Sequence, residues 1–175
     1  MKQSATPPIH APAEGSTALP DEKLDRQIRE LIYVSCLCLD EKKFDEFLDL
    51  CADDFAYTIT AYSPEARTEM TWMDETKPSL RKMLDVLPRH NSDHSPLTRH
   101  ATVYTLHLAD DGAHADVVTA FQIFRTGLDG GGTQLLAVGR YYDRVRCAGG
   151  ERPTLVSRNV RLDTRELGLG SHIPF

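Results

Sequence analysis

The fold is decided by the stretch Thr133-Gln-Leu-Leu-Ala-Val-Gly-Arg-Tyr-Tyr-Asp-Arg-Val-Arg146 together with the later segment Thr154-Leu-Val-Ser-Arg-Asn-Val-Arg-Leu162. Both segments are long and about half apolar, which is typical of strands that pack one face of a sheet against helices. The turn between them contains two glycines, and a connection this short predicts antiparallel neighbours. We therefore expect a sheet of long antiparallel strands in this half of the chain.

The same pattern extends toward the N-terminus. Two further strands are predicted at about 99–108 and 115–125, each followed by turn residues. Before them, apolar and small or polar residues alternate over 55–60, which predicts another strand. The single tryptophan, Trp72, is predicted to lie in a loop after this strand.

Apolar residues at helical spacing predict three helices in the first half of the chain. They are expected over about Asp21 to Asp40, Glu41 to Cys51 and Ser79 to Leu87, with Asp21 capping the first. Helices followed by a meander of strands form an α+β pattern. We expect a strongly curved, mostly antiparallel sheet packed on three helices, which makes a cone with a pocket, as in the nuclear-transport-factor-2-like (NTF2-like) fold. That fold hosts enzymes, binding modules and scaffolds, so it does not by itself give the function.

Length and composition restrict the class of protein. The 175 residues fit one domain, predicted over 21–175, behind a flexible, proline-containing tail at 1–20. The formal net charge of -6 argues against binding of DNA or RNA, which requires a basic face. No apolar run approaches the roughly 20 residues that a membrane helix needs, and the N-terminus lacks the apolar core of a signal peptide. A cytoplasmic protein without membrane contacts is therefore expected.

The sequence offers no convincing set of ligands for a metal or another cofactor. His90 and His94 have a spacing that can share an ion on a helix, but the segment around them reads as a loop. The Cys-x-His-type pairs of a Rieske cluster do not occur, nor does a Walker loop or a nucleophile elbow. The four cysteines are predicted to be reduced packing residues. We therefore expect no metal and no cofactor in this chain.

Acid–base catalysis is an alternative. Enzymes with a cone fold often place a carboxylate and a His or Tyr in the pocket, where desolvation tunes their pKa values. The candidates in this chain are Tyr33, Asp53, Asp54, Tyr57, His100, Asp116 and Asp143, and the alternative site is assigned to Tyr57, His100 and Asp116. Because no spacing singles out a pair of them, a free-standing dehydratase, isomerase or cyclase stays an alternative, as does a ligand-binding or dimerisation module.

A cluster of arginines is the most specific feature of the sequence. Seven arginines and three acidic residues lie between positions 140 and 165, whereas residues 21–54 hold eleven acidic and five basic residues. Arginine forks pair well with carboxylates and suit wet interfaces, so the cluster predicts a subunit interface. The residues predicted to form it are Arg140, Arg144, Arg158 and Arg161. A solvated sheet face with cross-strand ion pairs is the alternative.

Four short motifs resemble one protein family. The motifs are Pro96-Leu97-Thr98-Arg99-His100, Phe121-Gln122-Ile123-Phe124-Arg125, Gly139-Arg140-Tyr141-Tyr142-Asp143-Arg144-Val145-Arg146 and Arg158-Asn159-Val160-Arg161-Leu162-Asp163. In this order they resemble the small (beta) subunit of Rieske non-haem iron ring-hydroxylating oxygenases, and the resemblance covers about residues 24–175. Departures in the segment before Pro96 and before the last strand fit a divergent branch, such as the alkanesulfonate (methanesulfonate-type) monooxygenase hydroxylases.

The resemblance implies a cone-fold small subunit that binds no cofactor of its own. In such enzymes the large (alpha) subunit carries the Rieske [2Fe-2S] cluster and the mononuclear iron, and the small subunit stabilises an assembly of three large and three small subunits. The implied partners are therefore the large subunit and further copies of this chain, as a trimer or another homo-oligomer. The substrate, and the choice between a monooxygenase and a dioxygenase, stay open.

Overall fold

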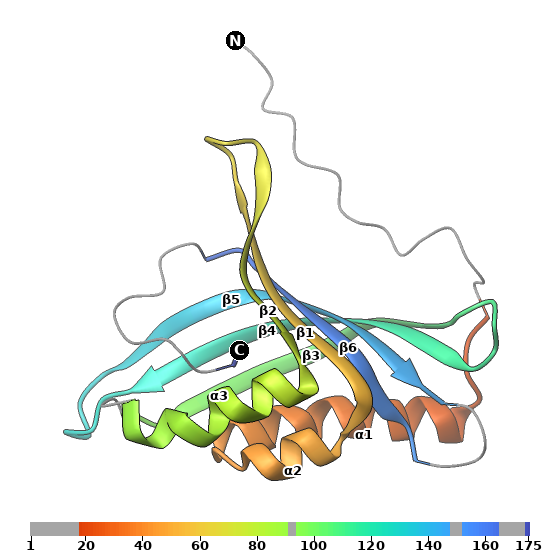
Figure 1. Ribbon diagram of the computed structural model, residues 1–175, viewed down its shortest axis with the longest axis horizontal. Coiled ribbons are helices and arrows are strands. Elements are labelled where there is room, and N and C mark those ends of the chain that lie inside the picture. The colour runs from red at the N-terminus through yellow and green to blue at the C-terminus, as the bar shows by residue number, and fades with distance from the viewer. Residues whose placement is uncertain (1–17, 91–93, 148–151, 165–173) are drawn as a thin grey trace.

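The computed structural model describes residues 18–90, 94–147, 152–164 and 174–175. In this part of the chain it contains three helices and six strands (Figure 1). They are α1 (Glu22–Asp40), α2 (Phe44–Asp49), β1 (Cys51–Ser63), β2 (Thr68–Thr76), α3 (Lys77–His90), β3 (Leu97–Leu108), β4 (His114–Thr126), β5 (Thr133–Arg146) and β6 (Thr154–Leu162). Most of the predicted tail, residues 1–17, lies outside the described residues, so its flexibility stays a prediction.

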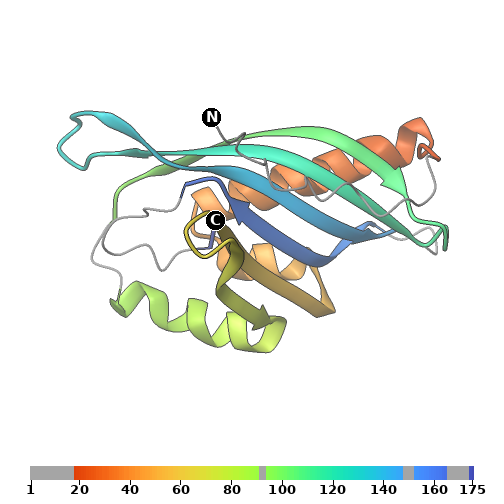
Figure 2. The same cartoon turned by 90° about the horizontal axis from the view of Figure 1, so that it is seen from above.

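The six strands form one curved sheet in the order β2-β1-β6-β5-β4-β3 (Figure 2). Neighbouring strands are antiparallel, apart from β1 and β6, which run parallel. The predicted meander is confirmed for β3 to β6, because each of these strands pairs with the next one along the chain. The parallel pairing places the N-terminal strand β1 directly beside the arginine-containing strand β6.

The helices cover one face of the curved sheet, as expected for an α+β cone (Figures 1 and 2). α1 packs against β3, and α3 packs against β1 and β2. Along β5 from Ala137 to Arg146, buried and half-buried residues alternate, so one face of the strand meets the core and the other faces outward. The largest fully buried apolar side chains are Tyr57, Tyr141, Phe47, Phe55, Phe121, Ile28, Ile32, Leu39, Leu48, Leu80 and Ile123.

The predicted helices are present, with corrected bounds. Asp21 caps α1 as predicted, because its Oδ1 accepts a hydrogen bond from the N–H of Leu24 at 2.7 Å. α3 is longer than the predicted 79–87, and α2 is shorter than the predicted 41–51. The reason for the short α2 is Lys42, whose φ of 57° puts it in the left-handed region and separates the end of α1 from the start of α2. Among the described helices none is long and apolar enough to cross a membrane.

The segment around Trp72 is a strand, and the prediction of a loop was wrong. β2 pairs antiparallel with β1 in a hairpin whose arm projects beyond the rest of the sheet (Figure 1). Trp72 is 42 % exposed, and the other residues of β2 are exposed or half-buried, so the strand has no alternating apolar pattern. Backbone pairing with β1, rather than burial of a side-chain face, forms this edge strand.

The buried thiols of the core should react slowly. Cys36, Cys38 and Cys51 are free and lie in the core, as predicted for packing residues. Burial raises the pKa of Cys51 to about 12. This lowers its thiolate fraction at pH 8 about a thousandfold relative to an exposed thiol. We expect iodoacetamide at pH 8 to label Cys51 only after unfolding in urea, measured by mass spectrometry of tryptic peptides. Equal labelling of Cys51 in the folded and the unfolded chain would contradict its buried position in the core.

Candidate functional site

A buried ion pair joins the sheet to α1. Arg158 in β6 and Asp143 in β5 are cross-strand partners, and both side chains are fully buried. The guanidinium group donates two hydrogen bonds to the carboxylate, from Nε to Oδ1 at 2.8 Å and from Nη2 to Oδ2 at 2.9 Å. Nη2 also donates to Oγ of Ser35 in α1 at 3.0 Å. The pair therefore links two strands and the longest described helix.

An aromatic stack lies against this ion pair. The Cζ of Arg158 is 4.3 Å from the ring centroid of Tyr141, a cation–π distance, and Tyr141 stacks on Phe121 with centroids 4.3 Å apart. Gly139 makes room for the stack, because a Cβ there would overlap the backbone oxygen of Arg161 and lie 2.9 Å from Cζ of Phe121. A close approach of strand and ring is thus the physical reason for the glycine that opens the β5 motif.

Arg158 and Asp143 each favour the charged form of the other. Burial alone lowers the pKa of Arg158, but the adjacent Asp143 carboxylate outweighs burial and raises that pKa above its ordinary value. Burial raises the pKa of Asp143, and the Arg158 guanidinium opposes the rise. Because both carboxylate oxygens accept hydrogen bonds from Arg158, the two groups are engaged with each other and not free for proton transfer to a substrate.

A second buried arginine joins β3 to the end of α1 and to the last described residues. Arg99 forms an ion pair with Asp40, and its Nη2 donates to the carbonyl oxygen of Pro174 at 2.6 Å. Nearby, the hydroxyl of Tyr57 donates to the backbone oxygen of Phe175 at 2.9 Å. Phe175 is 4 % exposed and belongs to the core. In Figure 1 this end of the chain lies between the sheet and α3.

The contacts of Arg99 were missed by the sequence analysis. Arg99 lies at the same strand parity as Ala101 and Val103, which face the core, so alternation alone could have marked it as an inward-facing arginine. Its partners Asp40 and Pro174 are 59 and 75 residues away in the sequence. No local pattern reveals contacts over that separation.

The three residues predicted for an alternative active site are not brought together. Tyr57 is fully buried and faces the core. His100 and Asp116 lie on the other face of the sheet: the ring of His100 meets Phe124 with centroids 5.3 Å apart, and Asp116 pairs with Arg144 at 3.4 Å. Because the sheet separates Tyr57 from the other two, these residues do not form one acid–base site.

Three of the four arginines predicted for an interface lie on the outer face of the sheet and are between 18 % and 43 % exposed. Each has an acidic partner in the same chain. The pairs are Arg140–Asp163 at 3.7 Å, Arg144–Asp111 at 3.3 Å, Arg144–Asp116 at 3.4 Å and Arg161–Glu69 at 3.3 Å. Partly exposed pairs of this kind contribute little to stability, so the arginines can exchange partners at low cost.

Arg158, the fourth arginine predicted for the interface, does not lie on this outer face. Its side chain is fully buried inside the chain and is bonded to Asp143 and Ser35. The physical reason is strand parity: Arg158 faces the same way as the buried Val160 and Leu162. Arg158 therefore packs within this chain.

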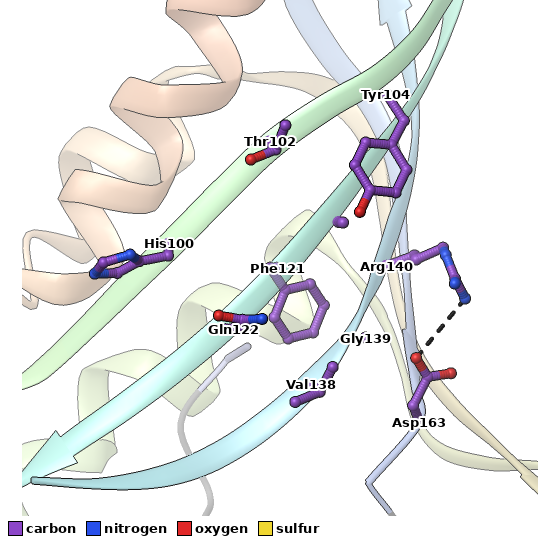
Figure 3. Close-up of a pocket in the computed structure, with 10 residues that line it drawn as sticks. His100, Thr102, Tyr104, Phe121, Gln122, Val138, Gly139, Arg140 and Asp163 are labelled. Atoms are coloured by element: carbon purple, nitrogen blue, oxygen red, sulfur yellow. Dashed lines mark ion pairs between the residues drawn. The ribbon is translucent and has the colours of Figure 1, made fainter.

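A shallow hollow of about 320 Å³ lies on the outer face beside Arg140 (Figure 3). It is lined by His100, Thr102, Tyr104, Ala120, Phe121, Gln122, Val138, Gly139, Arg140 and Asp163. The ion pair between Arg140 and Asp163 borders the hollow, as the dashed line in Figure 3 marks. Tyr104 is 62 % exposed. An exposed aromatic ring beside an arginine is typical of surfaces that contact another protein.

No metal centre is formed within residues 18–90, 94–147, 152–164 and 174–175, because no three His, Cys, Asp or Glu side chains gather there around a common point. The segment from Pro88 to Pro96 was predicted to be a loop, but α3 continues to His90, so this prediction was wrong for its first residues. Residues 91–93, between His90 and His94, lie outside the described residues. The expected absence of a metal from the whole chain stays a prediction.

Comparisons with known proteins give a matching family and two relatives with similar sequences. The model of the family described as ring hydroxylating beta subunit matches residues 36–168. The beta subunit of the methanesulfonate monooxygenase hydroxylase from Methylosulfonomonas methylovora is 45 % identical over 154 residues, which cover 84 % of each chain. The beta subunit of 2-aminobenzenesulfonate 2,3-dioxygenase from an Alcaligenes species is 35 % identical over 148 residues, which cover 84 % of this chain and 96 % of the relative.

Solved structures share the fold. A protein from Novosphingobium aromaticivorans, described as the beta subunit of an aromatic-ring-hydroxylating dioxygenase, superposes with a TM-score of 0.71 at 21 % identity, covering 86 % of this chain and 95 % of the other. This likeness shows the structural class of the fold, a cone of helices packed on a curved sheet. The chain belongs to the ring-hydroxylating beta subunit family, whose members are components of multicomponent oxygenases. The resemblance found in the sequence motifs is thereby confirmed.

Proposed function

We propose that this chain is a structural, non-catalytic small subunit that stabilises the hydroxylase of a multicomponent Rieske-type oxygenase. The observation that carries the proposal is family membership combined with an interior whose ionisable groups bond to the same chain. In this proposal the Rieske cluster and the mononuclear iron belong to the large (alpha) subunit, and this chain holds no cofactor. The proposal also includes a cytoplasmic assembly of three large and three small subunits, in which copies of this chain associate with one another.

The interior supports a structural role. A cone-fold enzyme needs a pocket in which an acid or a base is free to reach the substrate. Here the buried Arg158 bonds to Asp143, the buried Arg99 bonds to Asp40, and the hydroxyl of Tyr57 is engaged by Phe175. These contacts fasten α1 and the last described residues to the sheet, which suits a rigid scaffold.

The outer face supports contact with a large subunit. Arg140 and Arg144 project from the outward face of β5, close to the hollow that contains the exposed Tyr104. Their present partners include Asp163 and Asp111, both at partly exposed positions. Carboxylates of a partner subunit can replace these partners, because the displaced Asp163 and Asp111 are exposed enough to be solvated by water. An acidic surface of the large subunit is therefore the partner that this face fits.

The relatives indicate a substrate class for the assembled enzyme. One is named for methanesulfonate and the other for 2-aminobenzenesulfonate, which share a sulfonate group. We infer that the holoenzyme containing this chain oxidises an organosulfonate, with the substrate bound in the large subunit. Oxygen consumption by the assembled enzyme in the presence of each sulfonate tests this class.

Reversing the outer-face charges should weaken assembly and leave folding intact. In the double variant Arg140→Glu, Arg144→Glu, only partly exposed pairs are lost, each contributing about 0–1 kcal/mol to folding. Breaking one side of an interfacial charge pair costs about 2–5 kcal/mol of binding free energy. We expect a melting temperature within about 4 °C of the wild type. Size-exclusion chromatography after co-expression should show the large subunit dissociated from the variant.

The matched control is Lys23→Glu, Arg26→Glu, which reverses two exposed charges on the acidic helical side. This control should assemble like the wild type. Arg158→Glu is unsuitable as a test, because it breaks the buried ion pair and so affects folding first. A complex of unchanged size and yield with the Arg140→Glu, Arg144→Glu variant would favour the solvated sheet face with internal ion pairs.

A further inference from the structure

Pro174 and Phe175 occupy the inside of the cone in the way that a ligand would. The ring of Phe175 is buried in the core at 4 % exposure. Arg99 donates to the oxygen of Pro174 at 2.6 Å, and Tyr57 donates to the oxygen of Phe175 at 2.9 Å. Both donor side chains are fully buried and come from different strands, β3 and β1. A phenyl ring with adjacent oxygen acceptors is thus held by converging donors in the core.

The same interior has hydrogen-bonding capacity that the described residues leave unused. Arg99 Nε, Arg158 Nη1 and the hydroxyl of Tyr141 are buried and have no partner in the described part of the chain. Arg158 lies over the ring of Tyr141, and Arg99 and Tyr57 bond to the adjacent residues Pro174 and Phe175, so the four side chains line the same interior. Buried donors without partners are costly unless water or a ligand satisfies them. The region can therefore donate hydrogen bonds to more oxygen atoms than those of Pro174 and Phe175.

We propose that the interior of the cone is a binding site for a phenyl group carrying a carboxylate, and that Phe175 fills this site as an internal ligand. Arg99, Arg158, Tyr57 and Tyr141 supply donors for oxygen atoms, and guanidinium–carboxylate hydrogen bonds are among the strong ones. Arylalkanoates such as 3-phenylpropionate combine the required ring and oxyanion. The inference goes beyond the scaffold function, because a scaffold does not need its interior to bind a ligand.

The Phe175→Ala variant of the full chain tests the proposal. Removing a buried phenyl group leaves a cavity, and we expect the melting temperature to fall by about 10 °C. At ten times its dissociation constant, 3-phenylpropionate should raise the melting temperature of the variant by about 3–6 °C. Isothermal titration calorimetry should show binding of one ligand per chain. The wild type should show neither effect, because Phe175 already fills the site.

Control ligands and variants separate this site from unspecific binding. Acetate lacks the ring and benzyl alcohol lacks the carboxylate, so each should bind the Phe175→Ala variant at least about tenfold more weakly, a difference of one lost charge-assisted or apolar contact. Leu135→Ala truncates a side chain that is 55 % exposed and should create no binding. In the Phe175→Ala background, Arg99→Gln should weaken binding of 3-phenylpropionate by at least about tenfold.

If Phe175→Ala does not fold, Phe175→Val retains part of the packing and the same titration applies to it. Binding of 3-phenylpropionate to a folded Phe175 variant and not to the wild type supports the internal-ligand site. The proposal is overturned if a folded variant binds no arylalkanoate, or if the wild type binds it equally well.

Discussion

The Arg158→Met variant should lose about 3–5 kcal/mol of unfolding free energy, because removing one partner of a buried ion pair leaves the other charge unpaired. Asp143 is enclosed at the centre of the sheet, and both of its carboxylate oxygens accept hydrogen bonds from Arg158. Ser35 in α1 loses its donor in the same variant. A loss of this size is a large share of the about 5–15 kcal/mol that a domain typically has. Urea denaturation followed by circular dichroism measures it.

A double-mutant cycle isolates the pair from the packing around it. Asp143→Leu alone should lose a similar amount, since it leaves the Arg158 cation without a counter-charge. Arg158→Met combined with Asp143→Leu should lose less than either single variant, because no charge is then left unpaired. Arg144→Met, in a partly exposed pair, should lose less than about 1 kcal/mol. If Arg158→Met lost no more than Arg144→Met, the buried pair would not stabilise the fold.

The isolated chain should oxidise no sulfonate, and activity should appear only in the complex with the large subunit. Oxygen activation needs a redox centre, and in the proposed function both redox centres belong to the large subunit. With the large subunit and a separate electron donor, the complex should consume oxygen when methanesulfonate or 2-aminobenzenesulfonate is added, the two sulfonates named in the relatives. Large subunit prepared without this chain should show turnover near background, because its assembly is lost.

Two outcomes of that experiment distinguish the non-catalytic role of this chain from the substrate class of the complex. Turnover by the purified chain alone would contradict the non-catalytic role. A complex that forms but oxidises neither sulfonate would contradict the substrate class and leave the scaffold role unchanged. The matched control is the complex without the electron donor, in which oxygen consumption should stop.

Strands with one face on the core could be predicted from the sequence, and the others could not. β3 to β6 alternate in burial over most of their length, so their bounds followed closely from the pattern of apolar residues. β2 has no buried face, and only its pairing with β1 defines it. The parallel contact between β1 and β6 joins distant parts of the sequence and has no local signal.

The sequence predicted which strands carry the arginines of the candidate site, but it did not predict which of these arginines are buried and which are exposed. The motifs around Arg140 and Arg158 marked the correct strands, and strand parity places Arg158 with Val160 and Leu162 on the inner face. Charge alone suggested an exposed position for it, because arginine is rarely fully buried unless it is paired. The partner Asp143 was present in the same motif, so parity and charge taken together would have indicated the buried pair.

The central claim is that this chain supports assembly and does no chemistry. It is tested most directly by measuring turnover per assembled complex in the variants Tyr57→Phe and His100→Ala. Tyr57→Phe removes the hydroxyl bonded to Phe175, and His100→Ala removes an exposed ring on the opposite face of the sheet. A structural role predicts that turnover per complex stays close to the wild-type value, so that any loss of total activity matches a loss of complex in size-exclusion chromatography. A variant that assembles fully and yet loses turnover by orders of magnitude would contradict it and place an active site in this chain.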